Sequence, residues 1–248
     1  KWTSLALPRL ATGVGGLDTV GERLVPMTDA GKVRRLGSTI VEQVMGSGVS
    51  ARVSGLLALG NQVSSNSSAC STGTEAIVEG ATRIRHGLAE RMLCGGSEGH
   101  SHYSWAGFDA MRVLSRRFND EPERASRPMS ASAGGFVPGA GAGVLHLESL
   151  ESASKRGARI HAELLGGALN CGGHRGGGSM TAPNPESVRR CIRAALADAR
   201  VEPREVDAIS GHADPCRLQQ LVAAMRGQIA RADDDDRQRE RDAGRATA

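Results

Sequence analysis

Residues 66–98 read NSSACSTGTEAIVEGATRIRHGLAERMLCGGSE, and they contain the clearest structural signals in the chain. Residues 71–87 place small and apolar side chains at helical spacing, which predicts a helix. Residues 90–98 contain a short apolar run that is followed by two glycines, which predicts a short buried strand. The buried face of the helix is expected to comprise Ala76, Ile77, Gly80, Ala81 and Ile84. A helix followed at once by a buried strand favours an α/β fold.

Cys70 lies where a predicted short strand, residues 61–68, gives way to this helix. A cysteine at a helix N-terminus faces unpaired backbone N–H groups and the positive end of the helix dipole, which favour the nucleophilic thiolate. The same N–H groups suit an oxyanion that forms on an attacked carbonyl. Small neighbouring side chains leave room for a substrate. The local pattern leaves a second interpretation open, a buried structural cysteine.

Predicted strands and helices alternate along the rest of the chain. Helices are expected at 33–59, near 107–115, at 148–157 up to Gly157, and at 184–200 behind an Asn184 cap. Further strands are expected within 134–150, at 159–170 and at 206–212. This alternation indicates an α/β fold with a largely buried sheet.

Composition and charge exclude several classes of function. The chain has 248 residues, 39% of them hydrophobic, with 31 basic and 27 acidic side chains and a net charge of +4. The charges lie in mixed runs without a basic stripe interleaved with aromatics, so we expect no nucleic-acid partner. No apolar run is long enough to predict a membrane span. The first residues lack the apolar core of a signal peptide, and the five cysteines are irregularly spaced, so we expect a cytoplasmic protein with reduced thiols.

Four blocks of sequence, in a consistent order, resemble β-ketoacyl-acyl-carrier-protein synthases of the synthase I and II group in the thiolase superfamily. The blocks are 66–98, FDAMRVLSRRFNDEPERASRP at 108–128, GGFVPGAGAGVLHLESLESASKRGARIHAELLGG at 134–167, and MTAPNPESVRRCIRAALADARVEPREVDAISGH at 180–212. The resemblance implies an α/β protein with the thiolase-like layered fold (α-β-α-β-α), here incomplete. It implies a poorly matched segment at 1–44, a synthase-like domain at 45–213 whose halves meet near 158–159, and a divergent charged tail at 214–248 that we expect to be disordered.

The resemblance also implies a site and partners. Cys70 is implied to accept an acyl chain from a carrier-protein thioester, and the family then condenses it with malonyl-carrier protein after decarboxylation. His212 falls at the position of the family's first catalytic histidine, Thr181 at a contact with the pantetheine arm, and Phe136 at a substrate-binding position. No metal or nucleotide cofactor is implied, because the phosphopantetheine arm arrives on the acyl carrier protein. Complete relatives are homodimers.

The sequence departs from the family pattern at several points. The later lysine, the second histidine and a Gly-Phe-Gly-Gly-like loop have no counterpart in residues 213–248. Ser130, Ala133 and Gly134 stand where the family usually has Asp, Arg and Asp. We therefore expect a chain truncated at both ends or frame-shifted after His212, in which acyl transfer still needs only the thiolate and an oxyanion site. Without the second histidine, condensation should be slower by a factor on the order of thousands.

Two rival interpretations follow from these departures. A non-catalytic partner subunit of chain-length-factor type, or an inactive remnant, would need no late catalytic residues, but partner subunits usually lack the nucleophile that Cys70 supplies here. A thiolase is disfavoured because thiolases use a different late cysteine and bind coenzyme A.

The other cysteines and histidines carry weaker signals. Cys171 and His174 have a metal-like spacing, but no second pair completes a tetrahedral set, so a loop is expected. Cys94 is expected in the core, and Cys191 at the flank of its helix or against the sheet. The GAGAG run at 139–143 is expected to allow close backbone packing.

Two surface groups remain open between a functional and a structural interpretation. The first group either lines an acyl pocket or lies in a solvated loop, and consists of His100, His102 and Tyr103. The second group either binds an acidic carrier protein or consists of solvated loop charges without a partner protein. Its members are Arg116, Arg117 and Arg124.

Overall fold

The structure is a computed structural model that describes residues 6–11, 13–127, 130–174, 177 and 184–203. The chain forms two compact units. The first comprises Lys1–Ser126 and Ser132–Glu163, and the second comprises Arg127–Ala131 and Leu164–Ala248. Each unit is described by itself.

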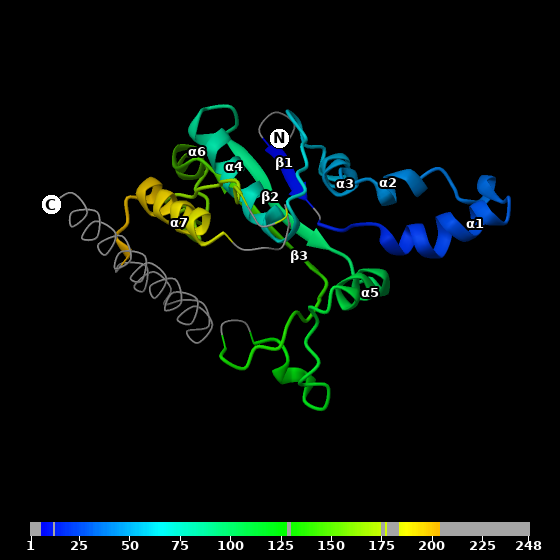
Figure 1. Ribbon diagram of the computed structural model, residues 1–248. Helices are drawn as coiled ribbons and strands as arrows, with labels where there is room; N and C mark the ends of the chain where they lie inside the picture. Colours follow the sequence, from blue (N-terminus) through cyan, green and yellow to red (C-terminus); the bar gives the residue numbers. More distant parts are fainter. Residues whose placement is uncertain (1–5, 12, 128–129, 175–176, 178–183, 204–248) are drawn as a thin grey trace. The chain divides into compact units, whose positions relative to one another are not determined.

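The first unit contains a three-stranded sheet and most of the helices (Figure 1). The strands are β1 (Ala6–Ala11), β2 (Arg91–Glu98) and β3 (Gly141–Glu148). The α-helices are α1 (Val25–Asp29), α2 (Ile40–Val44), α3 (Gly48–Leu57), α4 (Thr72–Arg85), α5 (His102–Ala110) and α6 (Leu150–Lys155). A π-helical segment, η1, spans Thr19–Leu24, and three 3₁₀ turns are η2 (Val33–Arg35), η3 (Ala69–Ser71) and η4 (Pro122–Arg124).

Strand β2 lies in the middle of the sheet, parallel to β1 and antiparallel to β3. Arg91 pairs with Glu148 at one end of the β2–β3 ladder, and Glu98 pairs with Gly141 at the other. Gly95 lies so close to β3 that a Cβ there would lie 2.9 Å from the Val144 Cα and would overlap the Gly143 carbonyl. This close approach depends on Gly95 of β2 and not on the predicted 139–143 run, because a Cβ added at Gly139, Gly141 or Gly143 would have no atom within 4 Å. The prediction that the glycines of this run are needed for close backbone packing is therefore wrong.

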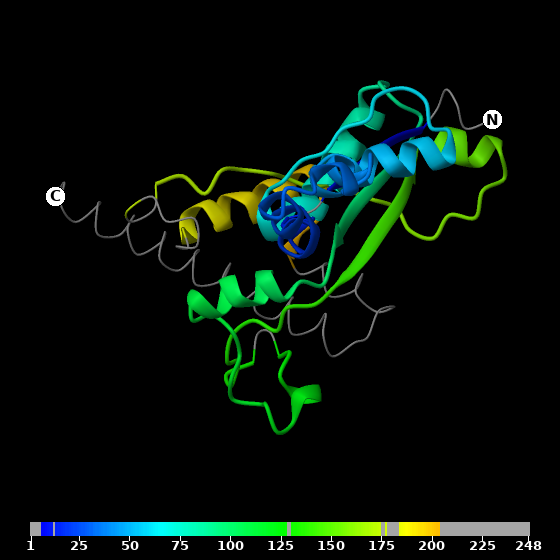
Figure 2. The same ribbon diagram turned by 90° about the vertical axis from the view of Figure 1, so that its right-hand side faces the viewer.

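Helix α4 contacts all three strands and supplies the main core of this unit (Figures 1 and 2). Met92 and Cys94 of β2 are 1% and 0% exposed. The partly buried apolar residues against them are Ile77, Ile84, Ala89 and Leu147. At Gly80 of α4 an added Cβ would overlap the Cys94 sulfur. These contacts confirm the predicted helix, its buried face, the β2 strand and the core position of Cys94.

The helix predicted over 33–59 is broken into three pieces. Gly37 has a φ of +83°, a left-handed conformation that ends η2 and separates it from α2. Met45 leaves the helical region at a ψ of 131°, which separates α2 from α3. Helix spacing alone did not reveal these breaks, although the predicted apolar positions Leu36 and Ile40 are indeed buried.

Two predicted strands do not form. Residues 61–68 contain a single bridge residue, Ser64, and residues 159–170 have no regular structure. A strand is stabilised by hydrogen bonds to a neighbour, and within the described residues the three-stranded sheet gives these segments no ladder. Helix α6 and the positive φ of Gly157 that follows it agree with the prediction.

The second unit is organised around α7 (Pro185–Ala199). Asn184 caps this helix, because its side chain accepts a hydrogen bond from the Ser187 N–H at 3.3 Å. The Asn170 side chain donates to the Ser187 carbonyl at 2.8 Å, and the Cys191 sulfur donates to the Ala168 carbonyl at 3.3 Å. The predicted cap and helix are confirmed, whereas the strand predicted at 206–212 lies outside the described residues.

Among the described residues, none of the helices combines the length and the apolar character that a membrane crossing requires.

Candidate active site

Cys70 lies in the turn η3, directly before α4, and its side chain is exposed. This turn is positioned by the sheet. Gly73, at the start of α4, lies so near the end of β2 that an added Cβ would be 3.5 Å from the Gly96 amide nitrogen. The start of α4 therefore lies against the C-terminal half of the central strand.

The segment that follows β1 lies beside the same turn. The N–H groups of Gly13 and Val14 donate to the Glu98 carboxylate at 3.1 and 3.2 Å. A Cβ on Gly13 would lie 3.6 Å from the Ala69 carbonyl oxygen. The ends of the two parallel strands and the start of α4 thus meet at Cys70. Ligand sites in open α/β sheets form at this end of parallel strands.

Thr72, which is buried, fixes the inner side of the turn. Its hydroxyl accepts a hydrogen bond from the Ser68 N–H at 2.7 Å and donates to the Ala69 carbonyl at 2.6 Å. Ala69 has a φ of +50°, a left-handed conformation that costs a non-glycine residue about 1–2 kcal/mol. The residue before Cys70 is therefore held in an unfavourable conformation by its neighbours.

Glu75 fixes the outer side of the turn. Its carboxylate accepts hydrogen bonds from the Asn66 amide at 3.1 Å and the Ser71 hydroxyl at 3.3 Å. The Ser68 hydroxyl also donates to it. Sequence reasoning did not single out Thr72 or Glu75, although a threonine three residues before a glutamate is a known signature of a helix start.

The other described cysteines lie in different surroundings. All four described cysteines are free thiols. Cys94 is buried under α4, Cys191 is half-buried on α7, and Cys171 is exposed in an irregular segment. Within the described part of the chain, only Cys70 combines an exposed thiol with a helix N-terminus. The Ser71 side chain does not cap that helix.

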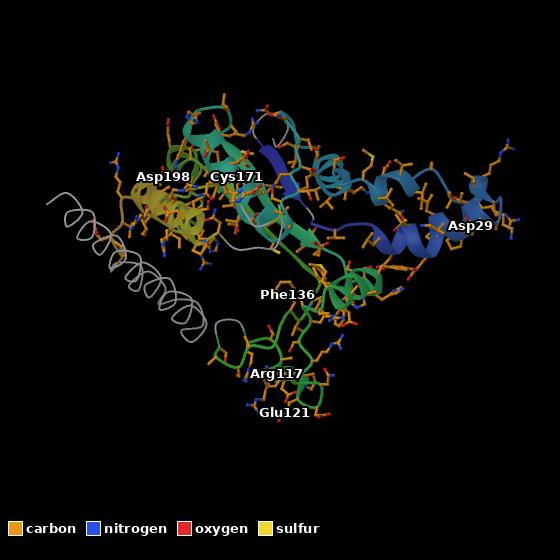
Figure 3. The ribbon with its side chains drawn as sticks, in the orientation of Figure 1. Asp29, Arg117, Glu121, Phe136, Cys171 and Asp198 are labelled. Carbon is orange, nitrogen blue, oxygen red and sulfur yellow. The ribbon has the colours of Figure 1, made fainter. Side chains whose placement is uncertain are left out.

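Phe136 lies in the segment that precedes β3 (Figure 3), and the residue is 54% exposed. It meets Phe108 of α5 edge-on, with ring centroids 5.9 Å apart. Its backbone accepts from the Ser115 N–H at 2.8 Å and donates to the Val113 carbonyl at 2.7 Å. Its ring contact and backbone hydrogen bonds among the described residues are with 108–115.

The two remaining residues of the predicted site, Thr181 and His212, lie outside the described residues. Cys171 and His174 form no metal-ligand group with a third residue among the described residues. The His174 carbonyl instead accepts a hydrogen bond from the Asn184 side chain at 3.2 Å, as expected of a loop.

An open hollow of about 580 Å³ lies between α5 and the loop that follows it. Its lining includes Arg112, Arg116 and Arg117, together with Asp109 and Gly134. Arg116 forms an ion pair with Asp109. Asp109 is the one acidic side chain among the described residues that line the hollow. The hollow therefore has an excess of positive charge.

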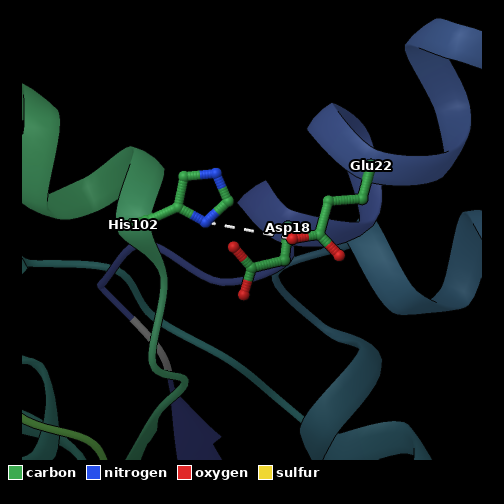
Figure 4. A group of neighbouring side chains, drawn as sticks. All are labelled: Asp18, Glu22 and His102. Carbon is green, nitrogen blue, oxygen red and sulfur yellow. Dashed lines mark ion pairs between the residues drawn. The ribbon is translucent and has the colours of Figure 1, made fainter.

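Two members of the predicted histidine and tyrosine group, His102 and Tyr103, lie against η1. His102 forms an ion pair with Glu22 at 3.9 Å, and Asp18 lies beside them (Figure 4). A Cβ on Gly21 would overlap the Tyr103 ring, so this glycine permits the contact between η1 and α5. The His102 and Glu22 side chains are 64% and 58% exposed, which makes this a solvated pair of little energetic weight.

Comparisons with known proteins agree with this arrangement. Residues 9–153 match the profile of the β-ketoacyl synthase N-terminal domain, and residues 161–221 match that of the β-ketoacyl synthase C-terminal domain. The chain is 41% identical over 210 residues to 3-oxoacyl-[acyl-carrier-protein] synthase I, chloroplastic, of Arabidopsis thaliana, covering 82% of this chain and 42% of that protein. It is 37% identical to 3-oxoacyl-[acyl-carrier-protein] synthase 2 of Synechocystis sp., covering 82% and 48%. The chain thus spans a little under half the length of these relatives.

Solved structures give the same result. A β-ketoacyl synthase from Burkholderia phymatum superposes with a TM-score of 0.73 at 32% identity, covering 82% of this chain and 48% of that one. The ishigamide ketosynthase/chain length factor gives 0.72 at 32% identity, covering 83% and 48%. The fold is the thiolase-like α/β fold that the sequence predicts. With a family profile matched over more than half of its residues, the chain belongs to the β-ketoacyl synthase family.

Proposed function

We propose that this chain is a 3-oxoacyl-acyl-carrier-protein synthase, an acyltransferase of fatty-acid or polyketide synthesis, with Cys70 as its nucleophile. The Cys70 thiolate attacks the carbonyl carbon of an acyl thioester on the carrier's phosphopantetheine. A new bond forms between that carbon and the Cys70 sulfur, the bond to the pantetheine sulfur breaks, and the pantetheine thiolate takes up the proton that Cys70 released.

In the second half of the proposed reaction, the bond between the malonyl carboxylate and its neighbouring carbon breaks and CO₂ leaves. The electron pair attacks the acyl carbonyl on Cys70 and expels the thiolate, and the product is a 3-oxoacyl thioester on the second carrier. The only prosthetic group in this proposal is phosphopantetheine, which arrives on the carrier protein.

One observation carries the proposal: the exposed Cys70 thiol lies at the N-terminus of α4, at the ends of two parallel strands, in a chain of this family. Backbone N–H groups at a helix N-terminus can stabilise an oxyanion, and removal of one such donor typically lowers turnover about a hundredfold or more. Small side chains on both sides of Cys70 leave space for the thioester.

The other predicted site residues take proposed roles. His212 donates a hydrogen bond to the thioester oxygen, and Thr181 contacts the pantetheine arm. Phe136 is proposed to bind the acyl chain, which its half-exposed ring supports.

The acyl carrier protein is the proposed partner. The arginine-lined hollow after α5 supports this, because its excess of positive charge suits an acidic carrier. A similar solved structure, 30% identical with a TM-score of 0.72, is described as a type II polyketide synthase acyl carrier protein in complex with its ketosynthase. We further propose that the protein forms homodimers and acts in the cytoplasm, where its four described thiols would remain reduced.

Intact mass spectrometry after incubation with an acyl-loaded carrier protein tests the proposal. The wild-type chain is expected to gain the mass of one acyl group, whereas Cys70→Ala gains none and keeps its far-UV circular dichroism spectrum. Cys171→Ala is the matched control, because Cys171 is the other exposed cysteine among the described residues, and it should be acylated like the wild type. A folded chain that captures no acyl group would contradict the proposal and favour a non-catalytic partner subunit of chain-length-factor type.

A further inference from the structure

The carboxylate of Glu75 collects hydrogen bonds from both sides of Cys70. Oxygen Oε2 accepts from the Asn66 amide at 3.1 Å and from the Ser68 hydroxyl, both of which precede Cys70. Oxygen Oε1 lies 3.3 Å from the hydroxyl of Ser71, the residue after Cys70, and shares the proton of that hydroxyl with the Ser68 carbonyl at 2.8 Å. One side chain on the first turn of α4 thus connects the two arms of the nucleophile turn.

These hydrogen bonds do not serve as a helix cap. The residue at the cap position of α4 is Ser71, and its side chain does not accept from the helix. Glu75 instead reaches back to residues that precede the helix. The Asn66 amide also donates to the Thr72 carbonyl at 3.1 Å, so the same network joins the entering chain to the helix.

The conformation of the turn needs such support. Ala69, the residue before Cys70, has a φ of +50°, which a residue with a side chain adopts only when its surroundings impose it. Thr72 restrains the inner side through the Ser68 N–H and the Ala69 carbonyl. The Ser68 hydroxyl is restrained by Glu75, and the Ser71 hydroxyl by Glu75 together with the Ser68 carbonyl.

We propose that Glu75 is a positioning residue for the Cys70 nucleophile. It holds the turn 66–71 in the one conformation that places the thiol at the N-terminus of α4. The catalytic consequence rests on the proposed function of Cys70, whereas the restraint on the turn is a property of the chain itself.

The test compares Glu75→Ala with Glu75→Gln and with Glu79→Ala, a control one turn later on the same helix. Glutamine keeps a carbonyl that accepts from Asn66 or Ser68, and its NH₂ group can donate to the Ser71 hydroxyl. Alanine removes all three hydrogen bonds. Single-turnover acylation is measured against the concentration of acyl-carrier protein, and hydrogen exchange of the peptide spanning 66–75 is followed by mass spectrometry on the same full-length chains.

For Glu75→Ala we expect a maximal acylation rate about tenfold below that of the wild type, with a half-saturating carrier concentration within about twofold, because misplacement of a reacting group lowers the rate of the chemical step. Amide exchange in 66–75 should be faster. Glu75→Gln should recover acylation to within about threefold and restore slow exchange, and Glu79→Ala should match the wild type in both measurements.

The proposal is overturned if Glu75→Ala exchanges and acylates like the wild type, or if Glu75→Gln loses as much as Glu75→Ala. The proposal is also overturned if Glu75→Ala and Glu79→Ala lose acylation rate equally and both have an equally lowered urea midpoint, because the loss would then reflect general destabilisation. If the wild-type chain itself captures no acyl group, the proposed function fails, and hydrogen exchange still decides whether Glu75 holds the turn.

Discussion

At Gly80, helix α4 packs directly against Cys94 of strand β2. An added Cβ there would overlap the Cys94 sulfur and would lie 3.4 Å from a Leu147 methyl group. Cys94 is fully buried, so its side chain has little space into which it can move. The position of α4, and with it the position of Cys70, therefore depends on the absence of a side chain at Gly80.

Gly80→Ala should lower the free energy of unfolding by about 1–3 kcal/mol, the usual range for overpacking a filled core. Urea denaturation followed by circular dichroism measures this. Gly55→Ala is the matched control, because Gly55 lies in helix α3 with no atom within 4 Å of an added Cβ. That variant should be unchanged or slightly more stable. Equal effects at the two positions would show that close packing at Gly80 is not what the structure indicates.

Individual side chains were predictable where a pattern identified them. Cys94 followed from strand spacing and is fully buried, and the apolar face of α4 followed from helical spacing and is buried at Ala76 and partly buried at Ile77 and Ile84. The contacts of Glu75 were not predictable in the same way, because they depend on the path of residues 66–71, which spacing does not specify. Phe136 was expected at the substrate site by resemblance, and its observed partner is Phe108.

Helix α7 shows how a single cap organises an element. Asn184 accepts from the Ser187 N–H and also donates to the Gly172 carbonyl at 2.6 Å. The Ser187 hydroxyl donates to the same carbonyl at 3.0 Å. The irregular segment before the helix is therefore tied to the helix start by these two side chains.

Asn184→Ala should destabilise the second unit by about 1 kcal/mol through the lost cap, with a further loss from the Gly172 contact. The expected readout is a lower thermal midpoint and faster hydrogen exchange in 184–190. Ser47→Ala provides the comparison, because Ser47 occupies the cap position of α3 without a side-chain cap bond. If Ser47→Ala were as damaging as Asn184→Ala, the cap would not be the cause.

Helices whose spacing or cap lies within their own residues were predicted well, whereas segments whose structure depends on a neighbouring strand or on backbone conformation were predicted poorly. Helices α4 and α7 have strong spacing or a cap of their own, and both form as predicted. The strand expected at 159–170 has suitable residues, but hydrogen bonding in a strand requires a neighbour, and the segment is irregular. The helix expected over 33–59 is interrupted at Gly37 and Met45, where backbone conformation rather than side-chain spacing decides.

Glu148 connects three elements of the first unit. It ends β3, its side chain is 6% exposed, and it pairs with Arg156 beyond α6 and with Arg91 at the start of β2. The hydrogen bond from Arg156 lowers the pKa of Glu148 from 4.5 to about 2, against the opposing effect of burial. Since the folded chain holds this carboxylate ionised, the stabilisation is fully present above pH 4.5 and is lost as the pH falls towards 2.

Between pH 6 and pH 3 the wild-type chain should therefore lose about 1–2 kcal/mol more stability than Glu148→Gln, a figure reduced from the full shift because Arg156 is 44% exposed. Urea unfolding at the two pH values gives the comparison. Glu151→Gln, an exposed glutamate on α6, controls for the change in net charge and should keep the pH dependence of the wild type. Parallel pH dependence in wild type and Glu148→Gln would rule out this ion pair as the source.

For the protein as a whole, the central claim is that the convergence of β1, β2 and α4 makes Cys70 an acyl acceptor. The most direct measurement is peptide mapping by mass spectrometry after a brief incubation of the folded chain with acyl-carrier protein, with the acyl thioester located on a single residue. The account predicts that the acyl group is on the peptide that contains Cys70. An acyl group on Cys171 or Cys191 instead, or none on any peptide of a folded chain, would contradict it.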